Sequence, residues 1–188
     1  MEAMAEVDVC NSAELHCLTN LAEGYGFWVE ATVATQRQWW PSAEHFFQAG
    51  KFLEVDHQES IRRAREPGIA KHLGRSLSPL RPDWEDCKRT RLRTALLEKF
   101  WAHENVRQTL LSLPEGVRIV NGNVADAYFG TGPHGNGQNV LGVELQDLRA
   151  FFTSFPKRHQ LDVKIADVGE PSSPFAAVVD VTGISPVS

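Results

Sequence analysis

Residues 40–52 read Trp40-Pro41-Ser42-Ala43-Glu44-His45-Phe46-Phe47-Gln48-Ala49-Gly50-Lys51-Phe52. Ser42 follows a proline and precedes a run of aromatic residues, so we expect it to cap a helix over residues 42–53. At helical spacing, Glu44, Gln48 and Lys51 fall on one stripe of this helix. The opposite side carries the residues that can pack against a core: Phe46, Ala49, Gly50 and Leu53.

The polar stripe supports two interpretations. A carboxylate, an amide and an ammonium in a row suit a polar ligand, and the helix dipole favours an ionised Glu44 in the first turn. Most amphipathic helices, however, pack one face and leave the other solvated. The spacing alone favours this second interpretation.

Composition narrows the classes of protein. A chain of 188 residues, 42% of them hydrophobic, suits one globular domain with a sizeable core. The sequence has no transmembrane run and no signal-peptide pattern, so we expect an intracellular, cytoplasmic protein, with access to the nucleus left open. Cys10, Cys17 and Cys87 fit neither a disulfide framework nor a zinc pattern, and we expect no metal and no cofactor.

Positive charge is concentrated in one part of the chain. The net charge is −5, which argues against a general polyanion binder, yet residues 62–93 hold more than half of the 19 basic residues. A locally basic surface on an acidic protein suits a ligand that carries phosphate. For any single arginine, a solvated helix face explains the charge equally well.

Further elements follow from periodicity and from stop signals. We expect helices over residues 57–66, 83–101, 104–113 and 140–152, and a short helix over 69–73 that is closed by Gly74. Strands are expected at 27–33, 117–120, 161–168 and 175–181, whereas residues 1–16 show no firm period. Asp83 is a good N-cap for the long helix, in which Lys88 lies in line with apolar residues: Trp84, Leu92, Leu96 and Phe100.

A glycine-rich run extends from Asp126 to Gly142 and leads into the last helix, which Asn139 can cap. A flexible loop before a helix N-terminus can present backbone N–H groups to an anion. The run has neither the lysine and spacing of a P-loop nor a dinucleotide fingerprint. Taken alone, such a run is usually just a loop.

Several blocks of the sequence together resemble the NADAR (YbiA-like) family. They are residues 40–52, Asp83-Trp84-Glu85-Asp86-Cys87-Lys88, Lys99-Phe100, Asp126 to Gly132, and Gly137-Gln138-Asn139-Val140-Leu141-Gly142. The blocks follow the family's order and span roughly residues 18 to 152. The resemblance implies a single α+β, predominantly helical domain over 17–156. Residues 1–16 are then an N-terminal extension, and 157–188 a C-terminal extension with one or two edge strands.

The resemblance also implies an N-glycosidase that acts on ribose-phosphate compounds. The family's substrate types are ADP-ribosylated guanine in nucleic acid, which we expect here, and ribosylamino-pyrimidine intermediates of riboflavin synthesis. Breaking a C1′–N bond places positive charge on the ribose, for which Glu44 and Asp126 supply carboxylates. The remaining roles would fall to a base-stacking pair and to ligand-binding groups: Trp84 and Phe129 for the base, and Arg75, Gln48, Gly130, Gly132 and Asn139 for the rest of the ligand.

Lys88 has two possible roles in such a site. A neutral amine beside C1′ could attack the sugar and hold it as a Schiff base. Alternatively, the lysine is a point charge that binds a phosphate or a ribose hydroxyl. The sequence leaves the two roles evenly balanced.

The sequence departs from the family pattern at several places. Phe129 stands where the family usually has Trp, and it lacks the indole N–H donor. Asn121 stands where many members have Glu, and Leu18 and Leu21 replace aromatic residues. Two alternatives therefore remain: a non-catalytic ADP-ribose or NAD reader and a partner-binding scaffold. A reader would tolerate loss of Glu44 and a scaffold would need no polar stripe, yet this sequence has both.

Overall fold

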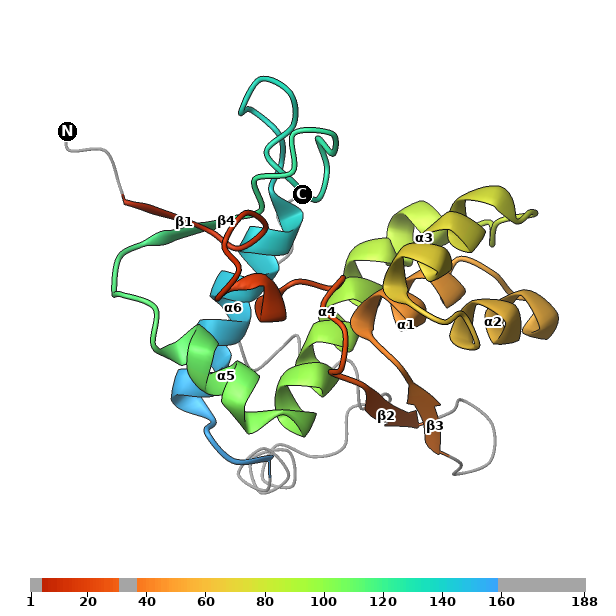
Figure 1. Cartoon of the computed structure of the whole chain (residues 1–188), viewed down its shortest axis with the longest axis horizontal. Helices are drawn as coiled ribbons and strands as arrows, with labels where there is room; N and C mark the ends of the chain where they lie inside the picture. The colour runs from red at the N-terminus through yellow and green to blue at the C-terminus, as the bar shows by residue number, and fades with distance from the viewer. Residues whose placement is uncertain (1–4, 31–36, 159–188) are drawn as a thin grey trace. The chain divides into compact units, whose positions relative to one another are not determined.

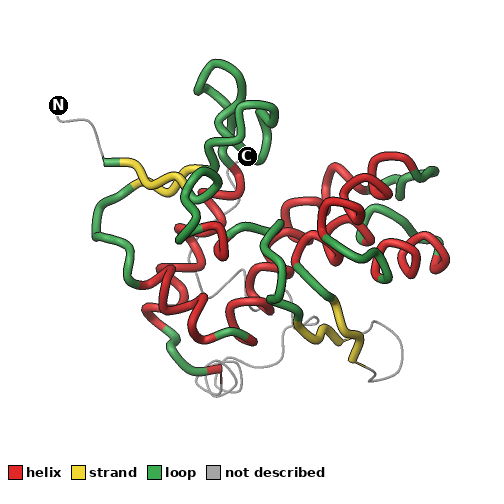
Figure 2. The backbone as a smooth tube through the Cα atoms, in the orientation of Figure 1, coloured by secondary structure: helices red, strands yellow, loops and turns green. Residues whose placement is uncertain are grey.

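The computed structural model describes residues 5–30 and 37–158. The chain divides into two compact units, residues 1–146 and 147–188. Helices are the main secondary structure of the described residues, as expected for this α+β chain (Figures 1 and 2). The helices are α1 (Ala43–Ala49), α2 (Val55–Arg62), α3 (Pro67–Ser76), α4 (Trp84–Ala102), α5 (Glu104–Leu111) and α6 (Val140–Ser154), with a 3₁₀ turn η1 (His16–Leu18).

The described strands form two short pairs (Figure 2). β1 (Glu6–Asp8) runs parallel to β4 (Arg118–Val120), and β2 (Phe27–Glu30) runs antiparallel to β3 (Arg37–Trp40). The strand expected at 117–120 is confirmed as β4, and the one at 27–33 is confirmed over 27–30, its remainder lying outside the described residues. β1 is too short to leave a period in the sequence. The strands expected at 161–168 and 175–181 also lie outside the described residues.

Helix α1 is the centre of the first unit, where it packs against α2, α3 and α4 (Figure 1). The N-cap is confirmed, because the Ser42 hydroxyl accepts a hydrogen bond from the His45 backbone N–H. All residues of α1 are buried, including Glu44 and Gln48. The polar stripe is therefore not solvated, and the interpretation that the sequence spacing favoured is wrong.

The end of α1 differs from the expected end near residue 53. The helix stops at Ala49, and the N–H groups of Lys51 and Phe52 then bond to carbonyls three residues back. This tight turn directs Phe52 into the core and leaves Leu53 61% exposed. Leu53 does not belong to the packing face, because the helical period no longer applies there.

Gly74 does not close a helix as the sequence suggested. It lies inside α3, which continues to Ser76. A Cβ at Gly74 would collide with the Gln48 side chain, so the glycine permits the close approach of α3 to α1. The approach places Arg75, in the last turn of α3, beside the polar stripe of α1.

Helix α4 confirms the expected long helix over 83–101 and its apolar row. Trp84, Leu92, Leu96 and Phe100 are buried, while Lys88 is only partly buried. Asp83 occupies the N-cap position, but its side chain makes no capping bond and instead pairs with Arg81 Nε at 2.6 Å. Arg81 thus takes the oxygens that would otherwise accept the first N–H groups of the helix.

The helices expected over 104–113 and 140–152 are confirmed as α5 and α6. Helix α6 begins in the first unit and ends in the second. In the second unit the described residues include a small aromatic group. The ring of Phe151 lies 5.3 Å from that of Phe152 and 5.4 Å from that of Phe155. Over the described residues, helices long and apolar enough to span a bilayer are absent.

Candidate active site

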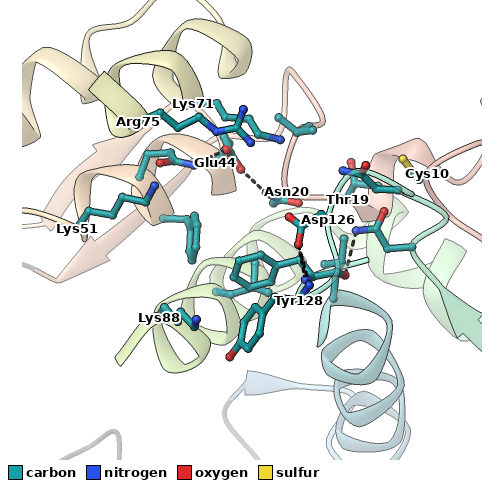
Figure 3. A pocket seen from close by; sticks show the side chains of 18 of the residues that line it. Cys10, Thr19, Asn20, Glu44, Lys51, Lys71, Arg75, Lys88, Asp126 and Tyr128 are labelled. Atoms are coloured by element: carbon teal, nitrogen blue, oxygen red, sulfur yellow. Dashed lines mark hydrogen bonds between the residues drawn. The ribbon is translucent and has the colours of Figure 1, made fainter. Parts of the chain in front are cut away.

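A pocket of about 240 Å³ opens beside α1, and all of its lining residues belong to the first unit (Figure 3). Side chains of α1, α3 and α4 meet there with residues from the segments that follow η1 and β4. Of the residues singled out in the sequence, the structure brings these together in the pocket: Glu44, Gln48, Arg75, Trp84, Lys88, Asp126 and Phe129.

Glu44 is the buried carboxylate of the pocket, with only 1% of its surface exposed. Gln48 Nε2 donates to Glu44 Oε1 at 2.7 Å, and the Asn20 side-chain amide donates to Oε2. Burial raises the pKa of Glu44, while the hydrogen bonds from Gln48 and Asn20 and the ammonium groups of Lys71 and Lys51 partly oppose that rise. The carboxylate is thus held in one orientation and can take up a proton more readily than an exposed glutamate.

Asn20 binds Glu44 through its main chain as well. The Glu44 backbone N–H donates to the Asn20 carbonyl oxygen at 3.0 Å. This N–H belongs to the first turn of α1, where no intrahelical acceptor exists. Asn20 therefore fixes both the start of the helix and the carboxylate.

Cations line the pocket next to Glu44 (Figure 3). Lys51 donates to the Gly74 carbonyl oxygen at 3.0 Å, and burial lowers its pKa, an effect that Glu44 opposes and that Arg75 and Lys71 reinforce. In the part of the chain that the structure describes, Lys71 and Arg75 form no ion pair. Three cations beside one carboxylate leave an excess of positive charge, which can bind a phosphate.

Most other cations of the basic region pair with carboxylates. Arg62 and Arg63 pair with Glu59, Arg81 with Asp83, and Arg89 and Arg93 with the buried Glu144. These pairs offset part of the positive charge of residues 62–93, whereas Lys71 and Arg75 lie with Lys51 in a small cationic wall of the pocket.

Aromatic rings line another part of the pocket. The ring of Phe47 lies 5.1 Å from that of Trp84 and 5.3 Å from that of Phe129, and Phe129 in turn contacts Tyr128 at 4.7 Å. Trp84 is 7% exposed, so most of its surface packs against protein. Such a group offers ring faces and edges to a base or a sugar.

Lys88 reaches the pocket beside this aromatic group. Its Nζ lies 2.5 Å from Glu85 Oε2 and 3.8 Å from the centre of the Tyr128 ring. An ion pair and a cation–π contact both stabilise a cation. The surroundings of Lys88 therefore suit a fixed positive charge.

Asp126 lies in the pocket at the start of the glycine-rich loop (Figure 3). Its Oδ1 accepts from the backbone N–H groups of Tyr128 and Phe129 at 3.0 and 2.8 Å. This Asx-type turn holds the carboxylate and the aromatic pair together. Asn121 also lines the pocket, and its Nδ2 donates to the Phe129 carbonyl oxygen at 3.0 Å.

Gly130, Gly132 and Asn139 are not among the residues that line this pocket. Asn139 has a positive φ of 51° and joins β4 to α6, with Nδ2 donating to the Ile119 carbonyl oxygen and Oδ1 accepting from the Asn121 N–H. A Cβ at Gly130 would lie 2.5 Å from the Asn123 carbonyl oxygen. Contact of these three residues with a ligand stays a prediction.

The amide groups at the start of α6 are already engaged. The N–H groups of Asn139, Val140 and Leu141 donate to the carbonyls of Gly130, Tyr128 and Phe129. The expected presentation of free N–H groups to an anion is therefore wrong for these residues. The loop uses its glycines to bring two stretches of backbone together.

Sequence reasoning missed several residues of the pocket. Asn20 lies in a stretch that matched the family only weakly, and Lys71 was one cation among many. Lys51 had the right spacing but no assigned contact, and Tyr128 carried no signal of its own. Only the packing of α3 against α1 distinguishes Lys71 and Arg75 from the solvated cations. Among the described residues, no group of His, Cys, Asp and Glu is placed to hold a metal ion.

The geometry defines a class of site: a small pocket with a buried carboxylate, a cationic wall and an aromatic wall, suited to a sugar phosphate joined to a ring. Residues 10–153 match the model of the NADAR domain, and the chain belongs to that family. The expected family is confirmed.

Similar proteins agree with this assignment. N-glycosidase YbiA of Escherichia coli is 44% identical over 111 residues, which cover 58% of this chain and 69% of that protein. Riboflavin biosynthesis protein PYRR of Zea mays is 33% identical over 122 residues, covering 59% of this chain and 19% of that protein. The solved structure of E. coli YbiA superposes with a TM-score of 0.65 at 30% identity, covering 92% of this chain and 94% of YbiA.

Proposed function

We propose that this protein is an N-glycosidase that hydrolyses the C1′–N bond of a ribose-phosphate conjugate. Its substrate is ADP-ribosylated guanine in nucleic acid, from which it removes ADP-ribose. The observation that carries the proposal is the buried, doubly hydrogen-bonded carboxylate of Glu44 beside unpaired cations. The name of the YbiA relatives, N-glycosidase, supports the reaction type.

The pocket residues can divide the reaction among them. Lys71, Arg75 and Lys51 bind the phosphate, and the Trp84–Phe47–Phe129 group holds the base or the sugar ring. As the C1′–N bond lengthens, positive charge develops on the ribose, and the carboxylate of Asp126 stabilises it. The base leaves with the bond's electron pair and takes up a proton from solvent. Water adds to C1′ and gives a proton to Glu44, which then releases it to solvent.

The raised pKa of Glu44 fits the role of proton acceptor. A general base works best when its pKa approaches the working pH, and burial moves a glutamate in that direction. The amide donors of Asn20 and Gln48 keep the accepting oxygens in place during the transfer. A non-catalytic reader would gain nothing from a buried carboxylate, which is costly to desolvate.

A ribosylamino-pyrimidine phosphate is the second candidate substrate. The pocket volume of about 240 Å³ lies below the range of roughly 300–1,000 Å³ that is typical for larger ligands. A ribose monophosphate with one ring fits that size, whereas most of an ADP-ribosylated oligonucleotide would extend beyond the pocket. The relative named as a riboflavin biosynthesis protein favours the same candidate.

For Lys88 we propose the positioning charge rather than the Schiff base, because Glu85 and Tyr128 surround it as they would a cation. Lys88→Arg separates the two roles, since arginine keeps the charge but does not act as an amine nucleophile. Retained turnover in this variant, with no borohydride-trapped adduct in the parent, is the expected result. A trapped protein–sugar adduct together with an inactive Lys88→Arg would establish the covalent role.

The reaction is tested by offering purified protein an ADP-ribosylated guanine oligonucleotide and, separately, ribosylamino-pyrimidine phosphates. Released base and sugar are quantified by chromatography, with the Glu44→Gln variant as a matched control. We expect release from the guanine conjugate by the parent protein only. Release from the pyrimidine phosphate alone would identify the second substrate, and release from neither would overturn the proposed reaction.

A further inference from the structure

Lys99 is a buried cation that no ion pair explains. It lies in α4 with 1% of its surface exposed, and within the described part of the chain it meets no carboxylate at ion-pair distance. Burial lowers the pKa of Lys99 to about 7. A methionine of similar length would fill this space without the cost of desolvating an amine, so its contacts must account for the lysine.

Those contacts lead to the segment that enters the pocket. Lys99 Nζ donates to the carbonyl oxygens of Cys17 and Thr19, the latter at 2.7 Å. Both carbonyls lie at the end of η1, where a helical turn leaves acceptors open, and the Thr19 carbonyl also accepts the Ala22 N–H at 3.4 Å. The ring centre of Tyr25 lies 5.2 Å from Nζ and adds a further contact. Lys99 thereby connects the end of η1 to the last turn of α4.

The next residue along this segment is Asn20, which holds Glu44. Its side-chain amide donates to the Glu44 carboxylate, and its carbonyl accepts the Glu44 N–H. Lys99 is thus connected to the carboxylate by its hydrogen bond to Thr19, the peptide bond from Thr19 to Asn20, and the hydrogen bond from Asn20 to Glu44. The amine therefore helps to set the position of Asn20.

We propose that Lys99 is a positioning residue for Glu44, which it holds in place through residues 17–20. Its role in turnover rests on the proposed function, whereas its effect on the geometry of Glu44 does not. Removing the amine takes a donor from the Cys17 carbonyl and leaves the Thr19 carbonyl only the long bond from the Ala22 N–H at 3.4 Å, which frees the segment to shift. Asn20 then loses its fixed distance from Glu44, although neither residue has changed.

Amide hydrogen exchange of Glu44 tests this directly and needs no substrate. Its N–H is protected by the Asn20 carbonyl, whereas the Phe46 N–H donates to Ser42 within the capped turn of α1. In Lys99→Met we expect exchange at Glu44 to accelerate by at least about tenfold, with Phe46 changing by less than about twofold. Equal acceleration at both residues, or no change at either, would show that Lys99 only stabilises the fold.

Two further variants keep this test decisive. Ile61→Val removes a buried methylene from α2 at a site that does not line the pocket. It should lower stability without accelerating amide exchange at Glu44 more than at Phe46. Lys99→Gln keeps a polar group at this site but is one atom shorter, so its amide lies farther from the Cys17 and Thr19 carbonyls than Nζ does and weakens both bonds. If Lys99→Met does not fold, a selective acceleration at Glu44 in Lys99→Gln supports the proposal, and its absence overturns it.

Kinetics extend the test to the reaction. Lys99→Met should lower kcat by about tenfold with KM within about twofold, because the phosphate and base contacts are unchanged. In the Asn20→Ala background the same substitution should have little further effect, since the two residues act in series. If the double variant instead lowers kcat by the product of the two separate effects, the two residues act independently and Lys99 does not act through Asn20. If the parent turns over no substrate, the proposed function fails while the exchange measurement still decides the role of Lys99.

Discussion

Helix α1 and the loop over residues 126–139 both border the pocket, yet they use their polar groups differently. In α1, the side chains of Glu44 and Gln48 face the pocket and bond to each other and to Asn20. In the loop, backbone groups bond to other backbone groups, and only the residues around Asp126 to Phe129 reach the pocket. Buried side-chain polarity therefore identifies the reacting part of the site, whereas glycine content identifies a closely packed scaffold.

The largest effect is expected from the carboxylate of α1. Glu44→Gln keeps the shape of the side chain and removes the proton acceptor, so turnover should fall by about a hundredfold or more. Circular dichroism should show an intact fold. Glu66→Gln, at an exposed position outside the pocket, is the matched control and should keep full turnover. Unchanged turnover in Glu44→Gln would transfer the main catalytic role to Asp126.

Trp84 tests the aromatic wall of the pocket, in which Phe47 of α1 contacts both Trp84 and Phe129 of the loop. Trp84→Ala should weaken ADP-ribose binding by about 1–3 kcal/mol in calorimetry, because a ring face for the ligand is lost. Trp28→Ala removes a 47% exposed tryptophan away from the pocket and should leave affinity unchanged. A lower melting temperature of Trp84→Ala with unaltered affinity would mean that this tryptophan only packs against Phe47.

Gly130 tests the scaffold role of the loop. A Cβ there would lie 2.5 Å from the Asn123 carbonyl oxygen and 2.9 Å from that of Asp126. Gly130→Ala should therefore lower the free energy of unfolding by about 1–3 kcal/mol in urea titration. Gly68→Ala places its Cβ in open space within α3 and should not destabilise the protein. Equal stability of both variants would contradict close packing at Gly130.

Lys99 predicts how stability depends on pH. Its pKa is about 7 in the folded protein and near 10.5 when unfolded, so between these values the unfolded chain binds more protons. The free energy of unfolding of the parent, relative to Lys99→Met, should therefore rise with pH by up to about 1.4 kcal/mol per unit. Urea titrations from about pH 7 to 8.5 measure this difference. A difference that stays constant would show that Lys99 keeps its proton in the folded protein.

Much of this arrangement follows from local signals in the sequence. Ser42 predicted the start of α1, and the period of α4 placed Lys88 at the edge of the core. The end of α1 was not predictable, because the turn that buries Phe52 depends on tertiary packing. The role of Gly74 was also hidden, since glycine marks a helix end and a close helix contact equally well.

The candidate site was predictable in its types of residue and less so in its contacts. Glu44 and Asp126 followed from the chemistry that the family resemblance implied. Asn20 and Lys71 come from distant segments of the chain, and local patterns carry no information about which distant residues meet. The N–H groups of Asn139, Val140 and Leu141 were expected to face an anion, but loop carbonyls accept them.

The central claim is that a ligand binds at α1, its cationic neighbours and the Asp126 to Phe129 end of the loop, and not at Gly130 to Gly137. The most direct measurement is titration of the ¹⁵N-labelled protein with ribose 5-phosphate, followed by amide chemical shifts. We predict that the largest shifts fall on residues around Asn20, Glu44 and Arg75, and that Gly130 to Gly137 change little. The largest shifts at Gly130 to Gly137, with none around Glu44, would contradict the account.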